Sequence, residues 1–110
     1  MEIKHEKNEQ AHLVNLEGRL DAINNAKAES FFNQLTDSLD LSILVDCEKL
    51  DFINSSGLRV MIMTLKKLKS ANKNLVLCNL QKNIKDVFKF SGFTNLFDIE
   101  LSREEALKKL

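Results

Sequence analysis

The sequence contains no tryptophan, tyrosine or proline and only three glycines, so seven phenylalanines supply all of its aromatic content. No apolar run reaches the roughly 20 residues that a membrane-spanning helix needs. The first seven residues are rich in charge and lack the apolar segment of a signal peptide. We therefore expect neither a leader nor a membrane contact, and a cytoplasmic location.

Cysteine is also scarce, because Cys47 and Cys78 are the only two and they do not form a CxxC pair. Each lies in an apolar stretch, so we interpret both as core residues of a protein in a reducing compartment, not as a disulfide or metal ligands. Neither sign of charge is in excess, since 16 Lys and Arg balance 16 Asp and Glu. A nucleic-acid-binding domain normally has a basic excess. The composition therefore argues against nucleic acid as a partner.

The apolar pattern predicts one α/β domain over residues 1–110, a length that suits a single hydrophobic core. Apolar residues alternate with polar ones in some predicted strands and recur as a stripe along the predicted helices. They are almost continuous in the strands expected to be covered on both faces. Right-handed crossovers then give a mixed β-sheet with parallel central strands and about four helices. The predicted elements are strands at 2–7 and 11–20, a helix at 25–39, a strand at 41–47, a helix over 58–68, a strand at 75–78, a helix at 83–90, a strand at 97–100 and a helix at 103–110. The residues expected to be buried include Leu44, Val45, Leu58, Ile62, Leu65, Val76 and Phe88.

The stretch 50–59, Leu-Asp-Phe-Ile-Asn-Ser-Ser-Gly-Leu-Arg, is interpreted as the turn between a buried strand and a helix. Asn54, Ser55 and Ser56 are residue types that cap helix N-termini. A serine here is either a cap or a hydroxyl whose phosphorylation the positive end of the helix dipole would accept. Gly57 would cost about 1 kcal/mol relative to alanine in a helix, which indicates a close approach to the backbone. Functional crevices of such sheets lie at the carboxyl ends of the strands, where this turn is placed.

Other candidate groups have simpler interpretations. Asp21, Asp46 and Asp51 could form a metal or acid–base cluster, but we interpret them as solvated turn residues, with Asp51 in a loop. His5 and His12 lie in predicted strands with no nucleophile spaced for catalysis. No glycine-rich phosphate-binding motif is present. The residues themselves indicate no metal site, no cofactor site and no catalytic group, so we do not expect an enzyme.

Three segments together resemble the STAS domains of anti-sigma factor antagonists. Phe52-Ile53-Asn54-Ser55-Ser56-Gly57-Leu58, after an apolar strand, resembles that family's aromatic-Met/Ile-Asp-Ser-Ser/Thr-Gly-Leu signature. Residues 18–21, Gly-Arg-Leu-Asp, are similar to its Gly-Glu-Leu-Asp, and residues 88–93 are similar to its Leu-Phe-Asp-x-Ser-Gly-Leu stretch. The three occur in the family's order and cover essentially the whole chain.

The resemblance implies a monomeric protein that binds an anti-sigma factor of the ATPase-kinase type. In the family, this partner phosphorylates the serine after the signature Asp, the phosphate breaks the complex, and a PP2C-type phosphatase restores it. That serine is Ser55 here, with Ser56 as the alternative; Ser56, being nearer the helix, is expected to be tied to its backbone. The expected partner-binding residues are Asp21, Asp51, Asn54, Ser55, Ser56, Gly57 and Arg59.

Two residues depart from the family pattern. Asn54 stands where the signature has Asp, and Arg59 stands where many members have a second glycine. The amide at 54 still caps a helix but lacks a carboxylate that could orient the serine hydroxyl. A second interpretation therefore stays open, a STAS module that binds its partner constitutively or senses a ligand without phosphorylation.

Overall fold

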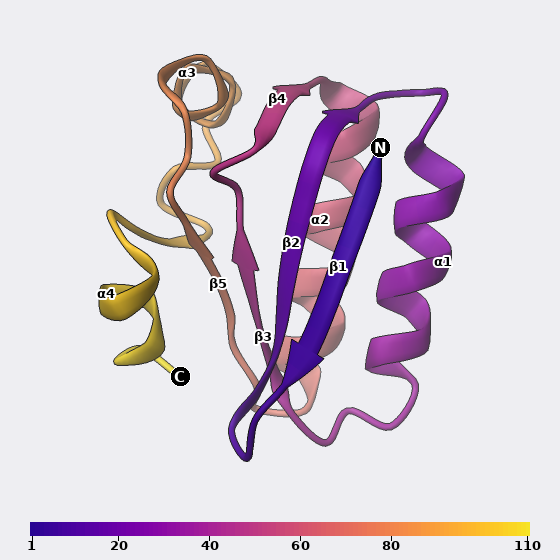
Figure 1. The fold of residues 1–110 in the computed structure, drawn as a ribbon, viewed down its shortest axis with the longest axis vertical. Helices are drawn as coiled ribbons and strands as arrows, with labels where there is room; N and C mark the ends of the chain where they lie inside the picture. The colour runs from indigo at the N-terminus through magenta and orange to yellow at the C-terminus, as the bar shows by residue number, and fades with distance from the viewer.

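A computed structural model describes all residues, 1–110, and places four helices around one mixed sheet (Figure 1). None of the helices combines the length and apolar character that crossing a membrane requires. The elements are β1 (Glu2–Lys7), β2 (Ala11–Leu20), α1 (Asn25–Thr36), β3 (Ser42–Asp46), β4 (Leu50–Ile53), α2 (Ser55–Ser70), β5 (Leu75–Cys78), α3 (Lys82–Phe90), β6 (Asp98–Glu100) and α4 (Arg103–Leu107).

The sheet has the predicted mixed topology. Its order is β1-β2-β3-β5-β6, with β1 antiparallel to β2 and every other pair parallel. The hairpin between β1 and β2 turns at Asn8, whose side-chain oxygen accepts hydrogen bonds from the backbone N–H groups of Gln10 (2.7 Å) and Ala11 (2.8 Å). The prediction that strands 41–47 and 75–78 are central and parallel is confirmed.

A strand is present where the sequence pattern indicated only a turn. Residues 50–53 form β4, which pairs in parallel with the last residues of β2, while the first residues of β2 pair with β3. The register shifts at Gly18, which has a φ of 100°. A four-residue strand gives little periodicity, and β4 forms because the ten-residue β2 extends beyond β3 and offers it a free edge. Asp51 is therefore a strand residue, and its prediction as a loop residue was wrong.

The helix ends also differ from the prediction at two places. Helix α1 ends at Thr36, not at Leu39, because Leu39 adopts a left-handed φ of 51° that a helix cannot continue. Helix α4 ends at Leu107, three residues before the predicted end. Its beginning agrees with the prediction, since the Ser102 hydroxyl caps it by accepting from the Glu105 N–H at 3.1 Å.

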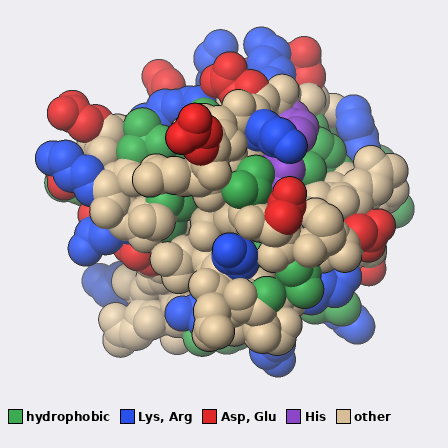
Figure 2. Space-filling model, turned by 90° about the horizontal axis from the view of Figure 1, so that it is seen from below, with side chains coloured by type: hydrophobic (Ala, Val, Ile, Leu, Met, Phe, Trp, Pro, Cys, Tyr) green, Lys and Arg blue, Asp and Glu red, His purple; other side chains and the backbone are tan.

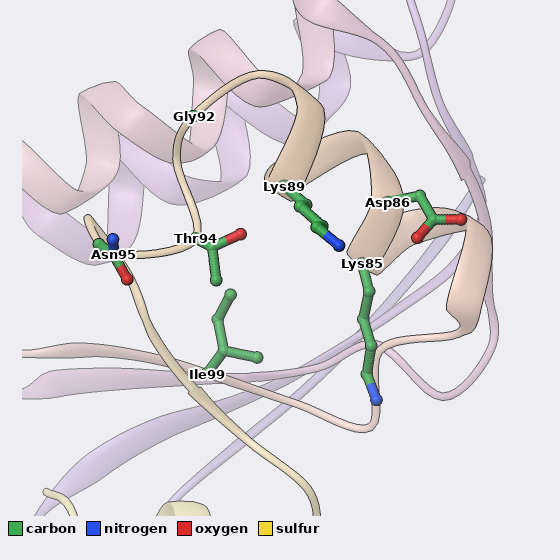
Figure 3. A pocket seen from close by; sticks show the side chains of 7 residues that line it. All are labelled: Lys85, Asp86, Lys89, Gly92, Thr94, Asn95 and Ile99. Carbon is green, nitrogen blue, oxygen red and sulfur yellow. The ribbon is translucent and has the colours of Figure 1, made fainter.

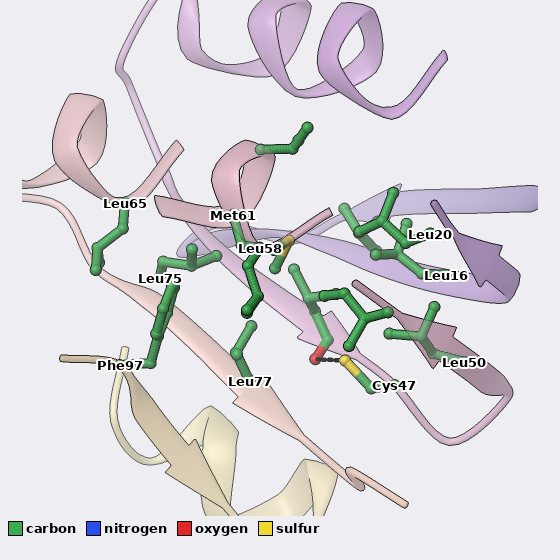
Figure 4. Packing of buried hydrophobic residues seen from close by; sticks show 14 of the residues in the cluster. Leu16, Leu20, Cys47, Leu50, Leu58, Met61, Leu65, Leu75, Leu77 and Phe97 are labelled. Atoms are coloured by element: carbon green, nitrogen blue, oxygen red, sulfur yellow. Dashed lines mark hydrogen bonds between the residues drawn. The ribbon is translucent and has the colours of Figure 1, made fainter. Parts of the chain in front are cut away.

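The main core lies between one face of the sheet and helices α1, α2 and α3, and Figure 4 shows α2 residues packed over β5. Six of the seven residues named above as core are buried, whereas Ile62 is only partly buried. Cys47 and Cys78 are free and buried, and burial raises the pKa of both thiols. They belong to the interior, as predicted.

The opposite face of the sheet is covered by α4, where Ala106 packs on Leu44, Val76 and Cys78. Arg103 anchors this helix by donating to Glu6 at 3.2 Å, Asn15 at 3.3 Å and Asp46 at 3.4 Å. The Asp46 side chain is only 6% exposed and also accepts from Asn79 at 3.1 Å. Its interpretation as a solvated turn residue was therefore wrong, because α4 and the residues after β5 close over it.

One face of the molecule carries charge of both signs without separating them. Figure 2 shows acidic and basic side chains interspersed over the face seen from below, with the histidines in one small patch. This agrees with a formal net charge of zero.

Candidate functional site

The carboxyl ends of β2 and β4 meet at one corner of the molecule. Leu20 and Ile53 are paired in the parallel register. The Asn54 N–H donates a hydrogen bond to the Leu20 carbonyl oxygen, with 3.4 Å between nitrogen and oxygen. Asp21 follows Leu20 and Asn54 follows Ile53, so both begin their loops at the same point (Figure 1). The structure thus establishes the proximity of Asp21 to the turn, which the sequence left open.

Asn54 is the cap of α2. Its side-chain oxygen accepts hydrogen bonds from the N–H groups of Ser56 at 3.1 Å and Gly57 at 3.3 Å, and its own backbone is extended. These bonds satisfy two of the four N–H groups that a helix start leaves free. Because the amide does this, neither serine hydroxyl is needed as a cap.

The two serines differ in their exposure. Ser55 is exposed and Ser56 is partly buried, and neither hydroxyl forms a hydrogen bond within the protein. The expectation that the Ser56 hydroxyl is tied to the helix backbone was therefore wrong, since only its N–H is bound, to Asn54. The first turn of α2 has no acidic residue that would repel a phosphate. Ser55 is thus the more exposed of the two serines.

Gly57 marks a close approach, as its position in a helix indicated. A Cβ at this residue would lie 2.5 Å from the Leu20 carbonyl oxygen and 2.9 Å from Cγ1 of Ile53. The neighbour is thus the end of β2 and not a ligand. Gly57 lets α2 begin directly against the sheet, which fixes where Ser55 stands.

Asp21 is tied into its loop. Its side chain is only 14% exposed and accepts hydrogen bonds from the N–H groups of Ile23 (3.1 Å) and Asn24 (3.2 Å) and from Nε of Arg19 (3.2 Å). Desolvation acts to raise the pKa of Asp21, but these hydrogen bonds outweigh it and hold the pKa below its ordinary value. The Arg19 guanidinium in turn lies over the Phe52 ring, 4.0 Å from its centroid. Asp21 thus lies in the loop predicted for it and shapes that loop beside Ser55, but its side chain is mostly buried and not solvated as expected.

Asp51 lies against the start of α3. Its carboxylate accepts from Gln81 at 3.3 Å, and its backbone carbonyl oxygen accepts from Asn83 at 2.8 Å. It does not line the hollow that contains Ser55. The structure therefore brings Asp21 and residues 54–57 together but turns Asp51 towards another helix.

A groove of about 580 Å³ runs from Ser55 along α2, and we call it the α2 groove. Half of its lining is apolar, two residues are basic and none is acidic. The lining consists of Ser55, Leu58, Arg59, Ile62, Met63, Lys66, Ser91 and Phe93. Sequence reasoning missed all of these but Ser55 and Arg59 as site residues. The spacing of Met63 and Lys66, four and seven residues after Arg59, could have indicated a shared helix face, whereas residues 91 and 93 carried no such signal.

A second hollow of similar volume lies beside α3, and Figure 3 shows its lining. Lys85, Asp86 and Lys89 extend from α3, and Ile99 is its one apolar residue. It shares no residue with the α2 groove. No group of three or more His, Cys, Asp or Glu side chains converges in a way that could hold a metal ion.

The histidines form a pair, with Nε2 of His5 3.0 Å from Nδ1 of His12. His12 is buried, and Nε2 of its ring lies 3.7 Å from an oxygen of Asp40. Burial is the main cause that lowers the pKa of His12, and the neighbouring His5 adds to it. No serine or cysteine lies within hydrogen-bonding distance of either ring, so the pair has no nucleophile to activate.

Comparison with known proteins places this geometry in context. The model of the STAS domain family matches residues 2–106. The Bordetella bronchiseptica protein BtrV, named as an anti-sigma factor antagonist, is 37% identical over 87 residues, which are 76% of this chain and 75% of BtrV. The anti-sigma factor antagonist SpoIIAA in its unphosphorylated form is 19% identical, with a TM-score of 0.76 over 98% of this chain and 96% of SpoIIAA. SpoIIAA of Bacillus in its phosphorylated form is 21% identical, with a TM-score of 0.75 over 98% of both chains. An anti-sigma factor antagonist of Mycobacterium paratuberculosis is 16% identical, with a TM-score of 0.89 over 98% of this chain and 92% of that one.

Proposed function

The chain belongs to the STAS domain family of anti-sigma factor antagonists, and on this premise we propose that it binds a kinase-type anti-sigma factor and is switched off by phosphorylation of Ser55. It acts as a single cytoplasmic domain, a monomer without enzymatic activity of its own. Phosphorylation dissociates the protein from the anti-sigma factor. A PP2C-type phosphatase removes the phosphate and restores binding.

The observation that carries the proposal is the Ser55 hydroxyl, which is exposed and has no partner within the protein. In the reaction its Oγ forms a bond to the γ-phosphorus of ATP, the bond from that phosphorus to ADP breaks, and the hydroxyl proton leaves to a base of the kinase. The product carries about −1.5 to −2 charges at pH 7. The start of α2 tolerates that charge, because the helix dipole is positive there.

The contact surface that we propose for the partner is the corner around Ser55. It comprises Asn54, Ser56 and Arg59 on the turn and first turns of α2, with the loop that Asp21 shapes beside them. Gly57 is buried and contributes by seating α2 on the sheet. Asp51 contributes indirectly, through the position of α3. A phosphate at the centre of this surface penalises an acidic or apolar partner face through its charge and the cost of desolvating it.

The test is phosphorylation by the cognate kinase with ATP, read by intact mass and by tandem mass spectrometry. We expect one phosphate on Ser55 in the parent protein and in Ser56→Ala, and none in Ser55→Ala, which should still bind the partner. Ser55→Asp should weaken the complex, and each tenfold loss of affinity corresponds to about 1.4 kcal/mol. Phosphate located on Ser56, or found in Ser55→Ala, would contradict the assignment.

Asn54 favours a second candidate function, constitutive binding or ligand sensing without phosphorylation, because an amide replaces the carboxylate of the family signature. Asn54→Asp distinguishes the two. The carboxylate still caps α2, and the rate of phosphorylation should rise if the amide is what slows it. If neither the parent nor Asn54→Asp takes up phosphate while both bind the partner, constitutive binding is the function.

A further inference from the structure

Arg59 differs from the other two arginines in having no acidic partner. Arg19 pairs with Asp21 at 3.2 Å, and Arg103 pairs with Glu6 at 3.2 Å and Asp46 at 3.4 Å. Arg59 is exposed and forms neither an ion pair nor a side-chain hydrogen bond. Glu29 lines a smaller hollow together with Arg59 between α1 and α2, but the two do not pair. The guanidinium is therefore free to bind an anion.

Ser55 and Arg59 lie one turn apart on the same side of α2. They are four residues apart, about 6 Å along the helix axis, and both line the α2 groove. An acidic group that precedes a basic one by four residues is the favourable order for a pair on a helix. A phosphate on Ser55, the first residue of α2, also suits the positive end of the helix dipole. The groove lining contains no carboxylate that would compete for the guanidinium.

We propose that Arg59 is the internal receptor for a phosphate on Ser55, an inference that rests on the proposed function of that serine. A guanidinium donates two parallel hydrogen bonds to phosphate oxygens, which a lysine ammonium cannot do. The phosphate is then held at the mouth of the α2 groove. There it pairs with the guanidinium that the unmodified protein leaves free.

The same cation defines what the unmodified groove accepts. Arg59 and Lys66 supply positive charge beside the apolar side chains of Leu58, Ile62 and Phe93. This combination fits a partner segment that carries a carboxylate next to apolar side chains. The phosphate therefore competes, within the same molecule, with the partner's carboxylate for Arg59. Its negative charge also repels that carboxylate.

The experiment places phosphoserine at position 55 by genetic encoding, so that no kinase is needed, and follows the phosphate by ³¹P NMR as a function of pH. The second pKa of the phosphate should be about half a unit lower in the parent protein than in Arg59→Gln, as an exposed ion pair would produce. Arg59→Lys should give an intermediate value, because it keeps the charge but loses the two-bond geometry.

Lys66→Gln is the matched control. Lys66 lines the same groove but lies 11 residues from Ser55, about 16 Å along the axis, so its removal should leave the phosphate pKa unchanged. The inference fails if Arg59→Gln leaves the pKa unaltered, or if Arg59→Gln and Lys66→Gln change it equally, since a general field would then be responsible. If the kinase never modifies Ser55, the proposed function is overturned but this inference is not. The phosphoserine in the NMR experiment is encoded genetically, so its pairing with Arg59 is measured without the kinase reaction.

Discussion

Two residues at the start of α2 have separate roles that together determine how Ser55 is presented. Asn54 binds the free N–H groups of the helix, which releases both serine hydroxyls from capping. Gly57 permits the contact with Leu20 that seats the helix on the sheet. The Ser55 hydroxyl is therefore exposed and unbonded because of the contacts that Asn54 and Gly57 make, not because of a contact of Ser55 itself.

Gly57→Ala should destabilise the protein by about 1–3 kcal/mol in chemical denaturation, as overpacking of a buried site does. The added Cβ would meet the Leu20 backbone carbonyl at 2.5 Å, and a backbone atom cannot move aside as a flexible side chain can. The better helix propensity of alanine, about 1 kcal/mol, does not offset this. Ser55→Ala, in the same turn but exposed, is the control and should change stability by no more than about 0.5 kcal/mol. Equal stabilities of the two variants would contradict the close contact.

Helix α2 divides its two faces between the core and the site. Leu58, Met61, Leu65 and Leu68 point into the main core, where Figure 4 shows the first three above β5. Ser55, Arg59 and Lys66 are exposed and line the α2 groove. Ile62 lies between the two faces, which explains why it is only partly buried. The apolar stripe thus orients the helix and thereby presents the groove.

Leu65→Ala tests this division, because Leu65 is 3% exposed on the core face. Truncation of a buried leucine leaves a cavity and should cost about 2–5 kcal/mol of unfolding free energy. Met63 lies on the same helix but is 42% exposed in the parent protein. Met63→Ala should therefore cost well under half of that amount. Urea denaturation of both variants measures the difference. A Met63→Ala loss as large as that of Leu65→Ala would mean that the faces are assigned wrongly.

At the scale of the whole molecule, the histidine pair brings the β1–β2 hairpin into contact with α1 and with the loop before β3. His5 on β1 contacts His12 on β2 and meets Phe31 of α1 edge-on, with ring centroids 5.5 Å apart. Asp40, in the loop before β3, lies 3.7 Å from the His12 ring. Lys7 adds a further positive charge near that ring. The charge state of His12 therefore affects contacts among β1, β2, α1 and the loop before β3.

Stability should fall as the pH drops below about 6.5, the ordinary pKa of histidine. Burial lowers the pKa of His12 in the folded state, so in this range the unfolded chain takes up a proton that the folded protein does not, and unfolding is favoured. Above this pH both states are neutral at His12 and the effect vanishes. Urea denaturation between pH 5.5 and 7.5 should show a flatter profile for His12→Gln, and His5→Gln should recover part of the loss by removing the nearby charge. Parallel profiles for the parent and His12→Gln would exclude this origin.

The sequence by itself determined those features that depend on neighbours along the chain. Apolar stripes and runs predicted every helix and five of the six strands, because the periodicity of a segment reflects which of its faces is buried. The motif Asn54-Ser55-Ser56-Gly57 indicated a capped helix start with a candidate hydroxyl, since capping is a local interaction. The family resemblance rested on the same short segments, and the match to the family over residues 2–106 confirms it.

Only the tertiary structure decided what depends on contacts between distant segments. Strand β4 exists because β2 extends beyond β3, Asp46 is buried because α4 and Asn79 cover it, and Asp51 turns to α3 because Gln81 binds it. Phe93 joins the α2 groove through the packing of α3, which no spacing in the sequence encodes. Each of these follows from strand register and the docking of helices on the sheet. Those depend on how all the elements fit together, so they could not be inferred from any one segment.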